Sequence, residues 1–312
     1  MKTKIWIALL ALYIVWGSTY LAIRFAVETI PPFLSAGIRF LISGAILFAW
    51  RWAAGDALPT KRQWRSTAVV GSLLLLGGNG LVSLAEQSVP SGIAALIIGS
   101  TPLWMTSIEA LRPGGVKPDW QAILGLLAGF GGIFLLVGPA ELTGNVHTLE
   151  PSGVVMLLSA AFLWSSGSIF GRNADMPKST LMATSAEMLT GSLALFVVSG
   201  LSGEWNGFDF ANVTLNSWLG LAYLITFGSM IGFVSFGWLL HNAPVSLVAT
   251  YAYVNPLVAV FLGAWLADEV IDARILAAGA IIIGSVVLIN QTRSNRKRLQ
   301  PEGAAAKAEQ VP

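Results

Sequence analysis

Several side chains that could bind a solute lie at helical spacing inside long apolar segments. They are polar or aromatic, and they fall on stripes of residues three or four positions apart, which share one face of a helix. The candidates are Trp16, Thr19, Tyr20, Asn79, Ser83, Trp104, Trp164, Tyr251 and Asn255. Amides and hydroxyls hydrogen-bond polar groups and indole rings stack on apolar ones, so this set predicts a site for a small organic solute.

Each candidate also has a structural interpretation. A hydroxyl such as that of Thr19 often bonds to its own backbone or packs helices together. Trp16 and Trp164 are equally suited to filling a core, whereas Asn79 and Asn255 are costly to bury without a partner. The asparagines are therefore the stronger candidates, and both interpretations stay open for the tryptophans.

Among the ionisable residues of the apolar segments, Arg24, Arg39, Glu86 and Glu187 are the candidates for an ion pair or for coupling. Such a charge at the centre of a membrane costs about 2.5–3.5 kcal/mol, so each needs a partner or a function. We expect Glu86 to pair with Arg39, Arg24 or both, either as a static pair that closes the outer side or as a gating or carboxylate-binding group. Glu187 is expected in the opposite half of the membrane, as a candidate for proton coupling.

Enzyme chemistry is not indicated. The sequence has no cysteine and only two histidines, and it lacks HExxH, P-loop and GxSxG motifs. We therefore expect no catalytic residue, no metal site and no cofactor. We also expect no nucleic-acid partner.

The composition requires lipid as the solvent for much of the chain. Of the 312 residues 55% are hydrophobic and 11% are charged, and the mean hydropathy is +0.71, whereas a soluble domain carries about 25% charged residues. A membrane helix needs about 20 apolar residues. Ten segments qualify, near 5–26, 33–53, 66–86, 91–111, 119–138, 151–171, 179–200, 216–240, 245–267 and 273–291.

The basic residues orient these segments. With both termini in the cytoplasm, the Lys and Arg residues outside the spans gather on the cytoplasmic side, and only Arg274 lies in an outer loop. Cytoplasmic loops of membrane proteins show this excess of basic residues. We therefore expect a multi-pass protein of the inner (plasma) membrane. Residues 293–312 form a basic tail that is expected to be disordered in the cytoplasm.

The chain contains an internal repeat. Matching residues at an offset of 154 are Pro90 with Pro244, Pro102 with Pro256, and Gly78 with Gly232. An odd number of spans per copy makes the second copy enter the membrane from the opposite face, as in carriers with inverted repeats. We expect repeats at 1–140 and 141–292, with Pro102 and Pro256 as paired hinges or as tolerated kinks.

The stretches WGSTYLAIRFAVETIPPFLSAGIRF, NGLVSLAEQSVPSGIAAL and SLVATYAYVNPLVAVFLGAWLADE resemble the drug/metabolite transporter superfamily, and within it the EamA-domain, ten-span exporters of YedA type. The resemblance covers all but the tail. It implies an all-α integral membrane protein of two inverted five-helix EamA repeats. It also implies a central cavity lined mainly by spans one, three, four, six, eight and nine.

These observations lead to the expectation of a secondary-active or facilitative transporter that exports small organic solutes by alternating access. Amino acids, metabolites and drugs are the substrate classes that the resemblance implies. The expected partners are the solute, the lipid bilayer and, for coupled transport, protons or another ion. A channel or a non-transporting accessory protein is the alternative, and the chain is expected to act as a monomer or a homodimer.

Overall fold

The structure, a computed structural model, describes residues 2–115, 117–137, 150–248 and 250–299. The regular secondary structure of these ranges is entirely helical. Nine of the described helical segments are long and apolar enough to cross a membrane, and Tyr251–Leu266 is a shorter apolar helix at the place of the ninth expected span. The expected all-helical membrane fold is confirmed.

The first five spans contain eight helical elements, because the third and fourth spans are divided. They are α1 (Lys2–Ala26), α2 (Pro32–Ala53), α3 (Lys61–Gly71), the π-helix η1 (Ser72–Gly80), α4 (Leu81–Ala85), α5 (Ser91–Ile98), α6 (Thr101–Leu111) and α7 (Trp120–Val137). The chain leaves α-helical geometry at η1 and between α5 and α6. A π segment inside a membrane helix widens one turn and often lies at a functional site.

The second set of spans repeats this plan. Its elements are α9 (Pro151–Asn173), α10 (Thr180–Leu201), the short 3-10 turn η2 (Phe210–Asn212), α11 (Leu215–Tyr223), the π-helix η3 (Leu224–Ile231), α12 (Gly232–Asn242), α13 (Val245–Val248), α14 (Tyr251–Leu266) and α15 (Ala273–Leu299). A π segment again divides the third span, and the fourth is again in two pieces. α15 continues past the end of the expected tenth span, while residues 300–312 of the tail lie outside the described residues.

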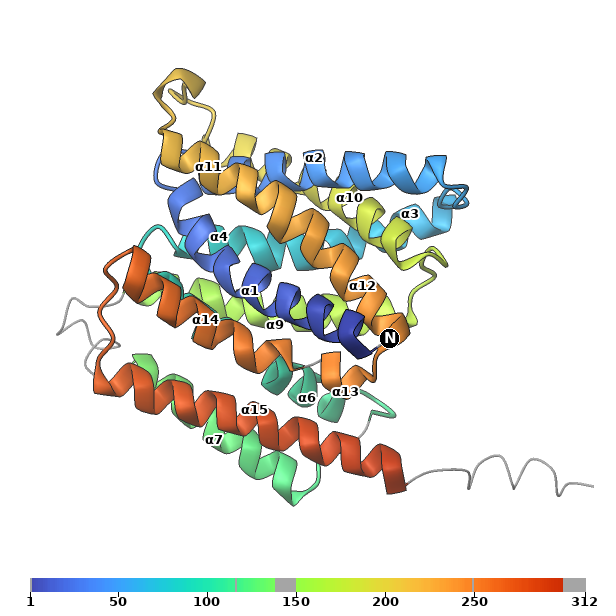
Figure 1. The fold of residues 1–312 in the computed structure, drawn as a ribbon, viewed down its shortest axis with the longest axis vertical. Helices are drawn as coiled ribbons and strands as arrows, with labels where there is room; N and C mark the ends of the chain where they lie inside the picture. The colour runs from blue at the N-terminus through green and yellow to red at the C-terminus, as the bar shows by residue number, and fades with distance from the viewer. Residues whose placement is uncertain (1, 116, 138–149, 249, 300–312) are drawn as a thin grey trace, which may run out of the picture.

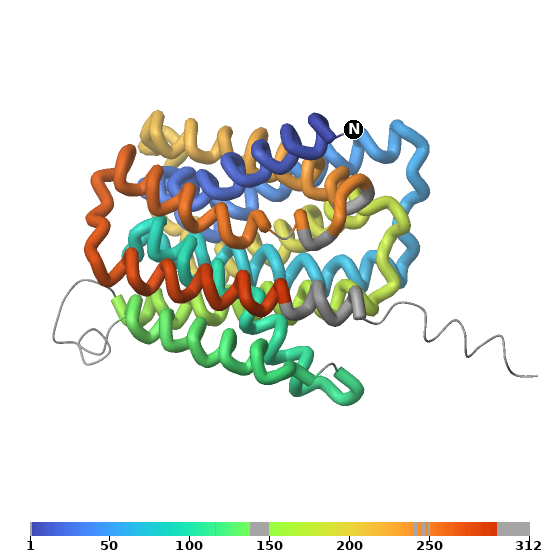
Figure 2. The backbone as a smooth tube through the Cα atoms, turned by 60° about the horizontal axis from the view of Figure 1, so that its bottom comes forward, coloured from blue at the N-terminus to red at the C-terminus, as the bar shows by residue number. Residues whose placement is uncertain are grey.

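Helices of the two halves pack against each other throughout the bundle (Figure 1). α2 packs on α10, α7 on α15, α1 on α14, and α9 on η1. The α7–α15 pair forms one flank of the molecule in the ribbon view (Figure 1), and the tube view shows α7 along the lower edge (Figure 2). A Cβ built on Gly125 of α7 would lie 2.7 Å from Cγ1 of Ile289 in α15, so this flank requires glycine for its close approach.

The helix starts follow from local sequence. Thr60 and Gln63 form a capping box at α3, and the Asp119 and Asp272 carboxylates accept from the backbone N–H three residues on, at 2.9 and 2.7 Å. These caps satisfy N–H groups that the first turn of a helix leaves without partners. The two aspartates precede α7 and α15, which are the fifth helices of the two halves, so the repeat extends to the caps.

Hydrogen bonds at the loops show which connections share an end of the bundle. Gln63 bonds Asp175 at 3.3 Å, which brings the second and sixth loops together, and Thr29 bonds Ser217 at 2.8 Å near the opposite end. The start of α1 lies at the same end of the bundle as the close of α15 (Figure 1). An even number of crossings requires this arrangement.

Candidate functional site

Two tryptophans join the halves at equivalent places. Trp16 of α1 packs on Gly232, directly after η3, and its Nε1 donates to the carbonyl oxygen of Gly228 at 3.1 Å. Trp164 of α9 packs on Gly78 in η1, where an added Cβ would lie 2.7 Å from the ring atom Cε3. The first helix of each half therefore inserts an indole against the π segment of the other half.

The Trp16 ring belongs to an aromatic cluster. Its centroid lies 5.3 Å from that of Phe233, 5.2 Å from that of Phe236 and 5.2 Å from that of Tyr251. The contacts with Phe233 and Tyr251 are edge-to-face, a geometry that aromatic rings favour. The structure thus brings the candidates Trp16 and Tyr251 together, and both rings fill space between α1, α12 and α14.

Two candidate residues direct the polar groups of their side chains to backbone carbonyl oxygens. Asn255 is 7% exposed, and its amide end faces the carbonyl oxygens of Tyr251 and Tyr13; with the amide oriented so that its nitrogen donates, the distances are 3.1 and 3.3 Å and the bonds link α14 to α1. Thr19 donates its hydroxyl to the carbonyl oxygen of Trp16 at 2.6 Å. Thr19 therefore has the structural role of bonding the backbone of its own helix. The buried Asn255 amide has hydrogen-bond acceptors in two helices.

Asn79 is placed differently. It lies half-buried in η1 beside Gly78, the glycine that receives Trp164, and its amide makes no hydrogen bond within the described residues. An amide with this freedom can bind a solute. Ser83, one turn further on in α4, is 4% exposed and lies between Asn79 and Glu86 along the span.

The expected pairing of Glu86 with Arg24 or Arg39 is wrong. Glu86 is 4% exposed, and both of its carboxylate oxygens lack a hydrogen-bond partner in the described part of the chain. Arg24 instead pairs with Glu269. Arg39 donates its Nε to the hydroxyl oxygen of Ser229 at 2.9 Å and lies over the Phe40 ring.

Glu269 is a site residue that the sequence does not single out. Its carboxylate accepts from the backbone N–H groups of Ser91 at 2.8 Å and Gly92 at 2.9 Å, and from the Ser91 hydroxyl at 2.8 Å. It therefore caps α5 and pairs with Arg24 in the same place. No local pattern reveals this, because the partners are 178 residues apart.

Glu86 remains within electrostatic range of Glu269, Arg24 and Arg39, and the Tyr20 phenol is within range of Glu86 and Tyr251. These residues come from α1, α2, α14 and the loops after α4 and α14. Tyr20 is thus near both Glu86 of the charged cluster and Tyr251 of the aromatic cluster. A carboxylate that is buried here without a direct partner is the group best placed to change its charge or to receive a ligand.

Glu187 lies apart from this cluster. It is half-buried on α10, where its backbone oxygen packs on Gly71 of α3, and its side chain forms no ion pair with any described residue.

Trp104 also lies apart from the other candidates. Its ring meets Phe130 of α7 at 5.1 Å and Phe162 of α9 at 5.6 Å, both edge-to-face. Its Nε1 is buried without a partner among the described residues. Trp104 lines a cavity between α6 and α9, together with Val155 and Phe162.

The two candidate hinge prolines lie in the fourth and ninth spans, which are in contact at Gly99. Pro102 lies in the first turn of α6, where its missing N–H removes no helical hydrogen bond, and the break in the span comes just before it. Pro256 is inside α14. A Cβ on Gly99, at the break, would lie 2.9 Å from Cγ of Pro256. The divided fourth span and the proline-containing ninth span therefore meet at mid-length.

No group of three or more His, Cys, Asp or Glu side chains in the described ranges could hold a metal ion.

Comparison with known proteins decides the family. The model of the EamA-like transporter family matches residues 3–138 and again 151–291. The chain belongs to the EamA-like transporter family. It is 38% identical over 283 residues to "Uncharacterized inner membrane transporter YedA" of Escherichia coli (strain K12), covering 90% of this chain and 89% of that protein. The resemblance seen in the sequence is confirmed.

More distant relatives of this EamA-family chain are consistent with the family assignment. It is 25% identical to "Uncharacterized transporter YvbV" of Bacillus subtilis (strain 168), over 99% of this chain and 98% of that one, and 24% identical to "WAT1-related protein At3g02690, chloroplastic" of Arabidopsis thaliana, over 93% and 70%. A solved crystal structure with 20% identity superposes with a TM-score of 0.62 over 91% of this chain and 96% of that one. This likeness supports the fold.

Proposed function

We propose that this EamA-family protein is a carrier that exports small organic solutes across the bacterial inner membrane by alternating access. The observation that carries the proposal is the exchange of tryptophans between the halves, Trp16 onto Gly232 and Trp164 onto Gly78. Inverted halves that contact each other through equivalent elements can adopt two arrangements of similar energy, one open to each side. The similarity to an inner membrane transporter supports the location.

The solute is proposed to bind where the two π segments face the first helix of the other half. Asn79 supplies an unused amide, and Trp16, Trp164 and Tyr251 supply aromatic surface. Tyr20 connects this surface to the charged cluster. Such a site suits solutes that combine an apolar or aromatic body with a polar group, because indole rings hold the body and the amide orients the polar group.

Glu86 and Glu187 are proposed as coupling residues, one in each half of the membrane. Each is a carboxylate without an ion-pair partner in the described residues, so a proton can bind to it without breaking an existing contact. The outer end is proposed to be the one that carries Glu204 and Glu269. The loops that carry Arg62 and Lys178 would face the cytoplasm.

The proposal is tested by solute counterflow in proteoliposomes, with labelled amino acids and lipophilic dyes as probes. We expect counterflow by the unaltered protein and a loss of at least about tenfold for Asn79→Ala and for Trp164→Ala, since about 1.4 kcal/mol of binding energy corresponds to a factor of ten. Glu28→Ala, an exposed residue in the first loop, is the control. Flux that does not saturate and shows no counterflow would indicate a channel and refute the carrier.

Coupling is tested in the same vesicles with an imposed pH gradient. Glu86→Gln keeps the shape of the side chain and removes its titration, so we expect exchange to continue while the response to the gradient falls. An unaltered pH response in both Glu86→Gln and Glu187→Gln would remove coupling from the proposal and leave a facilitative carrier.

A further inference from the structure

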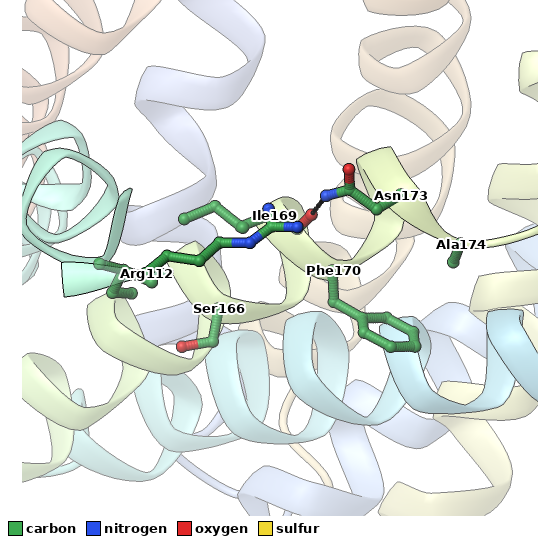
Figure 3. A pocket seen from close by; sticks show the side chains of 7 residues that line it. Arg112, Ser166, Ile169, Phe170, Asn173 and Ala174 are labelled. Carbon is green, nitrogen blue, oxygen red and sulfur yellow. Dashed lines mark hydrogen bonds between the residues drawn. The ribbon is translucent and has the colours of Figure 1, made fainter. Parts of the chain in front are cut away.

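A groove runs along the seam between α6 of the first half and α9 of the second. At one end of the bundle a cavity of about 340 Å³ is lined by Ile108 and Arg112 from α6 and by Ser166, Phe170 and Asn173 from α9. Figure 3 shows the Arg112 side chain extended across this cavity toward Asn173. A second cavity of about 530 Å³ lies further along the same two helices, between Trp104 and Phe162.

The two cavities lie along the same face of the α6 segment. Their lining residues there are Trp104 and Ile108 of α6 and Arg112, the residue that follows it, at steps of four. Residues four apart lie on the same face of a helix. From Trp104 to Arg112 the groove is roughly 12 Å long, at 1.5 Å per residue. That length is close to one leaflet, which is half of the roughly 30 Å hydrocarbon core.

The groove is closed at its base, where α6 and α9 are in contact, and it is open toward the outside of the bundle. Ser165, which is fully buried, donates its hydroxyl to the carbonyl oxygen of Thr101 at 3.1 Å, so the two helices are in contact beneath the groove. Phe162 and Phe170 are 43% and 44% exposed and form the rim. An apolar rim on the outside of a membrane bundle faces lipid chains.

Charge marks only one end of the groove. Arg112 is exposed and forms no ion pair within the described residues; Glu109, one turn earlier on α6, does not pair with it. The Asn173 amide nitrogen is already used by the carbonyl oxygen of Ile169, at 3.0 Å. A guanidinium at the end of an apolar channel matches an amphiphile with an anionic head and a long apolar chain.

We propose that this groove binds one anionic phospholipid, with its phosphate on Arg112 and an acyl chain along Ile108, Ser166 and Phe162. Guanidinium groups bind phosphate through two parallel hydrogen bonds, and basic pockets between membrane helices hold anionic headgroups. Because α6 and α9 belong to different halves, the bound lipid bridges the halves. It therefore stabilises one arrangement of the halves, and it does not occupy the solute site.

The proposal is tested by native mass spectrometry of protein purified from vesicles that contain phosphatidylglycerol and phosphatidylcholine with identical chains. We expect one phosphatidylglycerol to be retained preferentially by the unaltered protein. Arg112→Ala should weaken that retention about tenfold, which corresponds to about 1.4 kcal/mol. Ser166→Trp fills the groove without changing charge and should weaken it as well. Arg65→Ala, an exposed arginine on α3, is the matched control.

Three results would overturn the proposal. One is equal retention of the two lipids, and another is equal loss in Arg112→Ala and Arg65→Ala. The third is displacement of the bound lipid by millimolar glycerol phosphate, which would show a headgroup site without a chain groove. Retention is measured without transport, so a failure of the carrier proposal and a failure of this one are distinguishable.

Discussion

Two acidic side chains near Arg24, those of Glu269 and Glu86, differ in their hydrogen-bond and ion-pair partners. Glu269 is bonded to Arg24 and to the first two N–H groups of α5, whereas both carboxylate oxygens of Glu86 are buried without a hydrogen-bond partner in the described chain. An ion pair with a buried partner is costly to break, because the charge that remains is left unpaired. Replacing a buried carboxylate that has no partner by a neutral group of the same shape therefore removes no stabilising contact.

This contrast gives a prediction with an internal control. Glu269→Gln should lower the free energy of unfolding by roughly 2 kcal/mol, less than the 3–5 kcal/mol of a fully buried pair because Arg24 is partly exposed. Glu86→Gln should leave it unchanged or raise it. Thermal unfolding in detergent, followed by tryptophan fluorescence, measures both. Equal destabilisation by the two substitutions would contradict the assignment of Glu269 as the structural acid and Glu86 as the free one.

The π segments are the distinctive elements of the fold. Both occur in the third span of a half, and both receive a tryptophan at a glycine. A Cβ at Gly78 would lie 2.7 Å from Trp164, and one at Gly232 would overlap Trp16. Extra volume in a packed interface costs about 1–3 kcal/mol. The glycines are thus required for the close approach of the two halves.

Gly78→Ala and Gly232→Ala should therefore each reduce stability by about 1–3 kcal/mol and slow counterflow, since the indole must move. Gly284→Ala in α15 is the matched control, because no atom lies within 4 Å of its added Cβ, and alanine favours a helix over glycine by about 1 kcal/mol. Unfolding midpoints and flux are measured for the three variants. Loss of stability in Gly284→Ala comparable to that in Gly78→Ala would mean that helix distortion, and not the tryptophan contact, decides the effect.

At the scale of the whole molecule, the proposed orientation depends on charge. The end that carries the Gln63–Asp175 contact also carries the Arg62–Asp175 ion pair and the Arg51–Asp56 pair. The opposite end carries Glu204, which accepts from the N–H groups that open α2, and Glu269, which does the same at α5. Basic residues outside the membrane-spanning part favour the cytoplasmic side.

Cysteine labelling tests this orientation cleanly, because the sequence has no cysteine of its own. Single substitutions Asp56→Cys and Asp175→Cys should react with an impermeant maleimide only after the cells are opened. Glu28→Cys and Asp209→Cys should react in intact cells. Labelling of Asp56→Cys and Glu28→Cys from the same side would refute the inverted repeats, since those residues are separated by a single span.

The amino-acid sequence alone predicts the all-helical membrane fold and the internal repeat. These follow from properties that are local or periodic: apolar length, basic loops, and proline and glycine at a fixed offset. The contact partners of the candidate site residues are visible only in the packing of the helices. Arg24 binds Glu269 and not Glu86, Asn255 bonds α1, and Trp104 faces a lateral groove. Helical spacing fixes which face of a helix a side chain occupies, but the element against that face is set by packing between halves far apart in the chain.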